Sequence, residues 1–200
     1  PGPTPDLTPK PAPQSTPRPP PPPTPPLAPV PSSEPAADAQ RFCIVMVSDY
    51  DRGRRGDWDW VRPSLDSKRR YARLHGYDLR LEGKLDTSRP TSWSKVLALL
   101  KWIPHCAWTW YVDMDTIITN PAIKLEQLVA RHAVARRPQQ GPIDMLISRD
   151  CNGLNCGSFL IRRSEWSRAF LTQVYHTTRA PNVNRWWEQA AVQHLYQTHE

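Results

Sequence analysis

The sequence predicts an α/β domain in which short strands alternate with amphipathic helices. Two observations support this class: apolar runs of strand length recur along residues 41–200, and segments with helical spacing of apolar residues lie between them. Since strands that alternate with helices pair through parallel crossovers, we expect a largely parallel sheet. A third observation bounds the domain: 17 of the 24 prolines fall in residues 1–40, where no core can form.

The first strand is predicted from the uninterrupted apolar run of residues 42–47, which is typical of a strand buried on both faces. A Gly- and Arg-rich loop to about residue 62 follows, and then a helix that ends before Gly76, a C-terminal cap. Ser92 is the N-cap of another helix, which ends before Pro104. The same patterns predict the remaining elements: strands over 77–81, 108–112, 143–148 and 158–161, and helices over 64–75, 122–132, 164–175 and 185–196.

Residues 1–40 are predicted to form a proline-rich, disordered stem or linker with polyproline II character. A spacer is favoured over a ligand for SH3 or WW domains. The charge divides at the same place: residues 1–40 have 2 Lys/Arg and 3 Asp/Glu, and the rest have 24 and 16. A basic body suits an anionic ligand such as a nucleotide, but ordinary solvated Arg explains the charge equally well. The absence of any run of 18 apolar residues excludes a polytopic membrane protein.

The four cysteines lack the C-x-x-C spacing of zinc knuckles and thioredoxin-type redox motifs. Cys43 lies within the first apolar run and is expected to be simply buried. Cys151 and Cys156 flank a Gly- and Asn-rich turn, so they are the candidate pair for a disulfide in an oxidising compartment.

The sharpest candidate site is the pair of carboxylates Asp113 and Asp115, which directly follows the apolar strand 108–112. On extended backbone this spacing directs both side chains to one side. Two converging carboxylates suit a hard cation such as Mn²⁺ or Mg²⁺, completed by substrate phosphates and water. A lone Asp-x-Asp is more often an acidic turn. Here the buried strand before it favours the cation site, and Ile117 and Ile118 after it exclude an EF-hand.

Two further segments carry polar groups beside predicted elements. Residues 150–159 place two Gly and two Asn before a strand, where the backbone can approach a sugar or simply form a hairpin. Trp186-Trp187-Glu188-Gln189 lies at a predicted helix start. These residues either form part of a functional site or are an ordinary helix N-terminus, where an acidic residue is stabilising. No P-loop, dinucleotide fingerprint, nucleophile elbow or H-E-x-x-H motif is present. The basic clusters lack an RNA-binding motif, so no nucleic-acid partner is expected.

Several segments occur in an order typical of one enzyme family: Trp93-x-Lys95, residues 108–115, Asn120-Pro121, residues 152–162 and Trp166. Within them, Asp-x-Asp is followed about 40 residues later by Asn-x-Gly-Ser-Phe-Leu-x-Arg, and this combination is specific. Over about residues 41–195 the chain therefore resembles the fungal and plant family of α-galactosyl-, α-mannosyl- and xyloglucan α-xylosyltransferases.

The resemblance implies a GT-A type nucleotide-diphospho-sugar transferase over residues 41–200, with a Rossmann-like mixed sheet flanked by helices. It implies metal-dependent, retaining transfer of a hexose or pentose from a nucleotide-sugar donor to a glycan acceptor, either an oligo- or polysaccharide or a glycoprotein. It also implies a type II Golgi membrane protein with a lumenal catalytic domain and residues 1–40 as its stem. A membrane-bound glycosyltransferase complex is the implied protein partner.

The resemblance also assigns roles to individual residues. Asp113 and Asp115 would bind Mn²⁺, for which Mg²⁺ could substitute, and Asp113 would also face the donor's ribose. Glu188 and Gln189 would be the catalytic residues at the face of the reacting sugar, whereas Trp187 departs from the plant pattern Asp-Asp-Gln. The other expected donor-binding residues are Ser48, Asp49, Lys95, Asn155, Gly157 and Ser158.

One metal ligand implied by the resemblance is missing from the sequence. The family supplies a further His well downstream of the last helix, whereas His194 and His199 lie too early and the chain ends at Glu200. We therefore expect the domain of residues 41–200 to be truncated at its C-terminus. A UDP-sugar, UDP-xylose or UDP-galactose, is favoured as donor over GDP-mannose. The alternative is a catalytically inactive glycan-binding or scaffold relative, which the missing His and Trp187 support.

Overall fold

The computed structural model describes residues 41–49, 57–134 and 141–198, with the side chains of 57–60 left out. The predicted stem, residues 1–40, lies outside the described residues. No helix within the described ranges has both the length and the apolar character that crossing a membrane requires. The elements in chain order are β1 (Phe42–Val47), α1 (Asp57–His75), β2 (Asp78–Glu82), α2 (Ser92–Trp102), η2 (Ile103–His105), β3 (Trp108–Val112), α3 (Leu125–His132), β4 (Met145–Asp150), β5 (Gly153–Arg162), α4 (Glu165–His176) and α5 (Val183–Thr198).

The five strands form one mixed sheet in the order β2-β1-β3-β5-β4. β1 pairs in parallel with both β2 and β3, whereas β5 runs antiparallel to β3 and to β4. The largely parallel sheet expected from alternation is therefore wrong for one half, because β4 and β5 form a hairpin and no helix crosses over between them. The mixed sheet that the family resemblance implied is confirmed.

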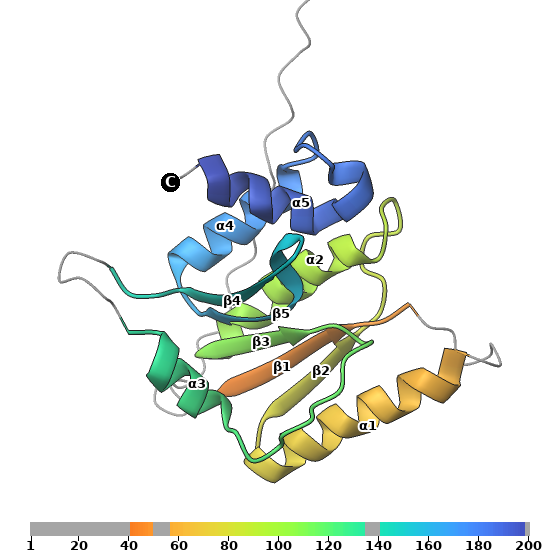
Figure 1. Ribbon diagram of the computed structural model, residues 1–200, viewed down its shortest axis with the longest axis vertical. Coiled ribbons are helices and arrows are strands. Elements are labelled where there is room, and N and C mark those ends of the chain that lie inside the picture. Colours follow the sequence, from red (N-terminus) through yellow and green to blue (C-terminus); the bar gives the residue numbers. More distant parts are fainter. Residues whose placement is uncertain (1–40, 50–56, 135–140, 199–200) are drawn as a thin grey trace, which may run out of the picture. The chain divides into compact units, whose positions relative to one another are not determined.

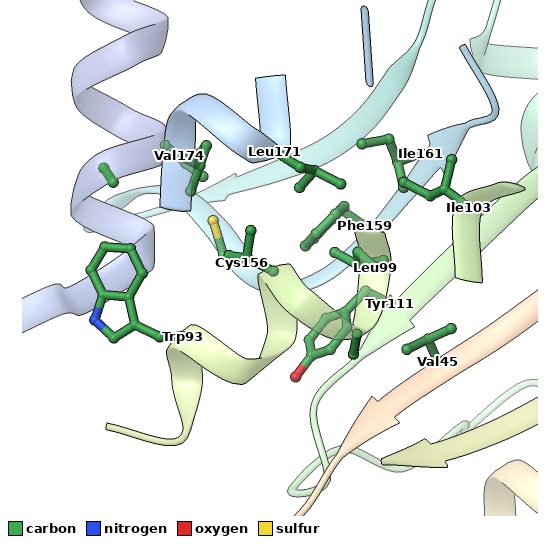
Figure 2. Packing of buried hydrophobic residues seen from close by; sticks show 14 of the residues in the cluster. Val45, Trp93, Leu99, Ile103, Tyr111, Cys156, Phe159, Ile161, Leu171 and Val174 are labelled. Carbon is green, nitrogen blue, oxygen red and sulfur yellow. The ribbon is translucent and has the colours of Figure 1, made fainter. Parts of the chain in front are cut away.

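β1 is buried on both faces, as its apolar run predicted. Val45 and Val47 belong to a cluster with residues of α2, α4 and α5, and Ile44 and Met46 belong to another with residues of α1 and α3. Figure 1 shows the same division, with α2, α4 and α5 over one face of the sheet and α1 and α3 over the other. Figure 2 shows the first cluster from close by, with Tyr111 of β3 among side chains of the sheet and of the helices that cover it.

The starts of two elements differ clearly from the sequence-based prediction. α1 begins at Asp57 and continues through Pro63, in a segment predicted to be a loop. Val61 and Leu65 are both buried, so the apolar face of this helix begins before Pro63, where Arg62 and Pro63 interrupt the apolar pattern. β5 begins at Gly153 rather than at residue 158, because the Gly- and Asn-rich segment pairs with β4 as a hairpin strand.

The disulfide joins Cys43 of β1 to Cys106, which lies two residues before β3, with a Cα–Cα distance of 5.8 Å. The expected pairing of Cys151 with Cys156 is wrong. Cys151 is exposed in the hairpin turn, whereas Cys156 is buried and contributes to the cluster in Figure 2. Parallel pairing of β1 with β3 brings Cys43 and Cys106 together across 63 residues of sequence, and spacing alone cannot reveal such a contact.

Candidate functional site

The ends of three strands meet at one edge of the sheet. Ser48 follows β1 and Asp113 follows β3, and parallel pairing places these two ends side by side. β5 runs in the opposite direction, so its first half lies beside the segment after β3, and the Asp113 amide donates to the Gly157 carbonyl at 2.8 Å. Polar groups far apart in sequence therefore gather at the edge where open α/β sheets bind ligands.

The two aspartates differ in environment. The Asp113 side chain is 35% exposed, and its Oδ1 accepts from the Tyr111 hydroxyl at 2.8 Å. Asp115 is exposed, and its carboxylate has no hydrogen-bond or ion-pair partner in the described part of the chain. The premise of extended backbone was wrong, because β3 ends at Val112 and the chain turns at Met114, which is buried.

Lys95 of α2 lies at the centre of the site. Its buried Nζ lies 2.8 Å from Glu188 Oε1, 2.8 Å from the Cys156 carbonyl and 3.4 Å from Asp113 Oδ1. The ammonium also sits 4.7 Å from the centroid of the Tyr111 ring. One charge thus connects β3, β5 and α5, which places the predicted donor-binding residue Lys95 between the predicted metal ligand and the predicted catalytic residue.

The pKa shifts follow from this burial and pairing. Burial alone would lower the pKa of Lys95, but the carboxylates of Glu188 and Asp113 outweigh burial and hold that pKa above its usual value. Burial raises the pKa of Asp113, although the Lys95 ammonium and the Tyr111 hydroxyl oppose that rise. Burial also raises the pKa of the Cys156 thiol to about 12, so this thiol stays protonated at neutral pH.

Glu188 and Gln189 reach the site from α5. Glu188 is 4% exposed, and its Oε2 has no partner among the described residues, while Gln189 Oε1 accepts from the Cys156 amide at 3.0 Å. Trp187 interrupts α5 with φ 49° and ψ −124°, and its side chain is 42% exposed. A positive φ is costly for a bulky residue and is typical of functional sites. The interruption lies immediately before the buried carboxylate.

Gly157 allows the close approach between β5 and Asp113. A Cβ at this position would lie 2.9 Å from Asp113 Oδ2 and 3.0 Å from Asn155 Oδ1, so a larger residue would occupy the space beside the carboxylate. Asn155 Oδ1 accepts from the Gly157 amide at 2.8 Å, and Asn155 Nδ2 donates to Asp150 Oδ2 at 2.7 Å. Both predicted residues therefore lie beside Asp113.

The remaining predicted residues are at or near the edge but outside this network. Ser158 alternates with Gly157 along β5, and its Oγ accepts from Trp110 Nε1 at 2.9 Å, on the face of the sheet opposite Lys95. The Ser48 amide donates to the carbonyl of the last residue of β2 at 2.9 Å. Asp49 accepts from the Thr91 hydroxyl, directly before α2. The structure thus brings Asp49 to the start of the helix that carries Lys95.

Lys68 is the main residue that sequence reasoning missed. It belongs to the basic run of residues 68–70, which suggests a solvated surface, yet it is completely buried and contacts the backbone next to Asp115. A signal was present: Lys68 follows Val61 and Leu65 and precedes Ala72 at helical spacing, so the pattern places it on the buried face of α1.

Asp113 and Asp115 are the residues that could hold a cation at this edge. The described residues contain no group of three or more His, Cys, Asp or Glu side chains placed to hold a metal ion. The exposed Asp115 carboxylate has no partner among the described residues, and together with the Asp113 carboxylate it fits a hard cation. Such a cation takes its other ligands from phosphate oxygens and water. The two aspartates fit a shared site, one in which the substrate supplies ligands.

Comparison with solved structures shows the class of fold. The chain superposes on a glycosyltransferase involved in glycosylation of the major capsid of PBCV-1 with a TM-score of 0.56. That match has 13% identity and covers 76% of this chain and 73% of the other. The glycosyltransferase GlyE of Streptococcus pneumoniae TIGR4 gives a TM-score of 0.52 at 15% identity, covering 80% of this chain and 44% of GlyE. The fold is therefore the GT-A type fold that the resemblance implied.

Comparison of sequences gives the family. Residues 38–200 match the model of the galactosyl transferase GMA12/MNN10 family, and the chain belongs to this family. The probable alpha-1,6-mannosyltransferase MNN10 of Saccharomyces cerevisiae is 30% identical, over 78% of this chain and 49% of its own length. An alpha-1,2-galactosyltransferase of Schizosaccharomyces pombe is 24% identical, over 82% of this chain and 52% of its own length. The chain thus spans about half the length of these fungal relatives.

A plant relative is also similar. Galactomannan galactosyltransferase 1 of Cyamopsis tetragonoloba is 30% identical, over 59% of this chain and 28% of its own length. Relatives named for galactosyl and for mannosyl transfer thus both match this chain at similar identity. The comparisons leave the donor sugar open.

Proposed function

We propose that the chain carries the donor-binding part of a metal-dependent, retaining glycosyltransferase that uses a nucleotide-sugar. The observation that carries the proposal is the contact of Asp113 with the buried pair of Lys95 and Glu188, next to Asp115 at the same edge of the sheet. Membership of the GMA12/MNN10 family supports the reaction class. The acceptor is a glycan, on an oligo- or polysaccharide or a glycoprotein.

The chain's own residues divide the work. Asp113 and Asp115 would hold Mn²⁺ or Mg²⁺, which when bound supplies charge stabilisation for a departing diphosphate. The missing Cβ at Gly157 lets the Asp113 carboxylate lie close against β5, and Asn155 fixes the backbone of β5 there. Lys95 keeps Glu188 in place at the face proposed for the reacting sugar. The buried Oε2 of Glu188 has no partner among the described residues, and it is the group proposed to face the sugar.

The disulfide supports the proposed compartment. Disulfides persist in oxidising compartments such as the lumen of the secretory pathway, and Cys43 is joined to Cys106. A Golgi membrane protein with a lumenal catalytic domain agrees with that chemistry, with residues 1–40 as the proposed stem. UDP-xylose or UDP-galactose is the favoured donor, and GDP-mannose is the alternative within the same family.

Calorimetric titration of UDP and of GDP into the chain, with and without Mn²⁺, tests the proposal. We expect Mn²⁺-dependent binding of one nucleotide, lost in the Asp113→Asn/Asp115→Asn variant. Asp66→Asn is the matched control, because Asp66 lies on α1 and its partners among the described residues are exposed arginines. If the folded wild-type chain binds neither nucleotide in the presence of Mn²⁺, the proposal is contradicted.

A second candidate function is a catalytically inactive relative that binds glycans. The observation in its favour is Trp187, whose exposed ring lies beside Glu188 at the position where the plant pattern has Asp. This candidate predicts glycan binding that needs neither Mn²⁺ nor nucleotide. Loss of that binding in Trp187→Ala, without any nucleotide binding by the wild type, would favour it.

A further inference from the structure

A second lysine is buried close to the aspartates, on the face of the sheet opposite Lys95. Lys68 of α1 is 0% exposed, and its Nζ lies 2.6 Å from Ser64 Oγ, 2.5 Å from the Thr116 carbonyl and 3.4 Å from the Met114 carbonyl. All three acceptors are neutral. A buried ammonium is costly when none of its hydrogen-bond acceptors is a carboxylate. The positions of the acceptors indicate what the charge does.

Both carbonyl acceptors flank Asp115. Lys68 therefore holds the peptide group that precedes Asp115 and the peptide group that follows Thr116, which restrains the backbone from which the Asp115 carboxylate projects. Ser64 Oγ lies within hydrogen-bonding reach of the same two carbonyls, at 2.8 Å from that of Thr116. One turn along α1, Ser67 Oγ accepts from the Ile118 amide at 2.9 Å.

Helical spacing explains how one element makes all these contacts. Residues 64, 67 and 68 lie at i, i+3 and i+4, so their side chains project from a single face of α1. Side chains of that face form hydrogen bonds with backbone groups of residues 114–118. The turn that carries Asp115 is thus held from behind by α1, while its carboxylate faces solvent.

The geometry points to Lys68 as a positioning residue for Asp115, which holds this carboxylate in place for a divalent cation bound with a nucleoside diphosphate. The inference rests on the proposed function, because it concerns the same site. Groups that orient metal ligands typically change metal affinity 10- to 100-fold when they are removed. Lys68 itself would touch neither the cation nor the diphosphate.

The sign of the effect separates positioning from electrostatics. Removing a positive charge near a cation site strengthens cation binding if charge alone matters. Weaker Mn²⁺ binding in Lys68→Met would therefore come from loss of the hydrogen bonds that fix the turn around Asp115. Lys68→Arg keeps a buried donor on the same helix and should restore part of the affinity.

The experiment measures free Mn²⁺ by electron paramagnetic resonance in the presence of the chain and either UDP or GDP. We expect Mn²⁺ affinity to fall 10- to 100-fold in Lys68→Met. Affinity should be unchanged in Arg70→Met, since Arg70 lies exposed on the same helix. Amide hydrogen exchange of the metal-free chain gives an independent readout. It should become faster in residues 113–118 of Lys68→Met and stay unchanged in α4.

The outcomes separate the two proposals. If the wild type binds no Mn²⁺ with either nucleotide, the proposed function fails and this inference fails with it. If the wild type binds and Lys68→Met binds equally well, only the role of Lys68 is overturned, even where exchange is faster. If Lys68→Met does not fold, Ser64→Ala weakens the same hold on the turn, and unchanged Mn²⁺ affinity in that variant would overturn the inference.

Discussion

Two lysines are buried on either side of residues 113–115, and their positive charges have different partners. Lys95 is surrounded by carboxylates, and its pKa is held above the usual value although burial opposes this. Lys68 has only neutral acceptors, and burial lowers its pKa to about 8 although Asp115 and Asp113 oppose this. Lys95 compensates the negative charges of Glu188 and Asp113, whereas Lys68 is proposed to orient the backbone on which Asp115 lies.

The difference shows that burial alone does not define what a charged residue does. Lys95 touches side chains that the site needs as anions, so its removal leaves Glu188 buried and unpaired. Removal of Lys68 leaves only carbonyl and hydroxyl groups, which cost less when they lose a partner. We therefore expect the two lysines to differ in their effects on stability, on pH dependence and on cation binding.

Lys95→Met is expected to have the largest effect. Breaking a buried ion pair by removing one partner typically costs about 3–5 kcal/mol of unfolding free energy. The measurement is urea unfolding of the variant and the wild type. Lys101→Met, on the same helix, is the control, because the Lys101 side chain is 53% exposed and exposed pairs contribute about 0–1 kcal/mol.

A double variant separates lost pairing from lost packing. Lys95→Met/Glu188→Gln removes both charges, so part of the lost stability should return. If the double variant is as unstable as the sum of the single variants, Lys95 contributes through packing and not through its charge.

Lys68→Met is expected to cost about 1–3 kcal/mol, the usual range for unsatisfied buried hydrogen-bonding groups. It should also change the pH dependence of stability. The pKa of Lys68 is about 8 in the fold and about 10.4 in an unfolded chain. The unfolded state thus binds more protons between these values, and Lys68 makes stability rise with pH across that window.

Urea unfolding between pH 7.5 and 10.5 in the presence of a chelator tests this difference, with those limits chosen around the two pKa values. The wild type should show a rise that Lys68→Met lacks. Identical slopes for both proteins would contradict the contrast with Lys95, whose raised pKa gives stability that is present below about pH 10.4 and lost above it.

Gly157→Ala is expected to have a smaller effect, about 1–2 kcal/mol, because its Cβ would overlap Asp113 Oδ2 and force local movement. A displaced Asp113 carboxylate should weaken the ion pair with Lys95 and leave the hydrogen bonds of Lys68 unchanged, since Asp113 contacts Lys95 directly but not Lys68. Thermal unfolding gives the cost. Gly83→Ala is the matched control, because a Cβ at Gly83 would meet no atom within 4 Å.

Asp86→Asn is expected to have the smallest effect, and it provides a buried charge that contacts neither Asp113 nor Asp115 among the interactions of the described residues. Hydrogen bonds from Ser88, partly offset by burial and helped by the Tyr175 hydroxyl, lower the pKa of Asp86. Its contribution to stability is present above about pH 3.9, the value in an unfolded chain, and is lost as the pH falls through the folded value. The acid limb of the stability curve should therefore flatten in Asp86→Asn, while the alkaline limb should match the wild type.

The sequence predicted those parts of the molecule that depend on local pattern. β1, α2 and β3 lie where their apolar runs placed them, because each is specified by adjacent residues. The N-cap of α2 was predicted one residue too late, since Thr91 and not Ser92 precedes the helix. The Cys43–Cys106 disulfide and the hairpin of β4 and β5 were missed, because both depend on which strands become neighbours. Pairing of distant segments is not contained in any local window.

The same division holds for the candidate site. The family resemblance singled out Lys95, Asp113, Gly157 and Glu188, and the structure brings these four together. It also singled out Ser158, whose hydroxyl faces the other side of the sheet. Lys68 escaped notice because a basic residue within a basic helix suggests a solvated surface, although its helical phase places it on the buried face.

The ion pair between Lys95 and Glu188 has a consequence for the order of folding. Its two residues are 93 positions apart, so Glu188 leaves the ribosome roughly 5–20 s after Lys95 at ordinary rates of synthesis. During that interval the ammonium of Lys95 is without its principal partner. A contact of such long sequence separation costs loop-closure entropy before it stabilises the chain. We therefore expect α5 to pack onto the sheet only after the folding transition state. Substitutions at Glu188 should then accelerate unfolding and leave the folding rate nearly unchanged.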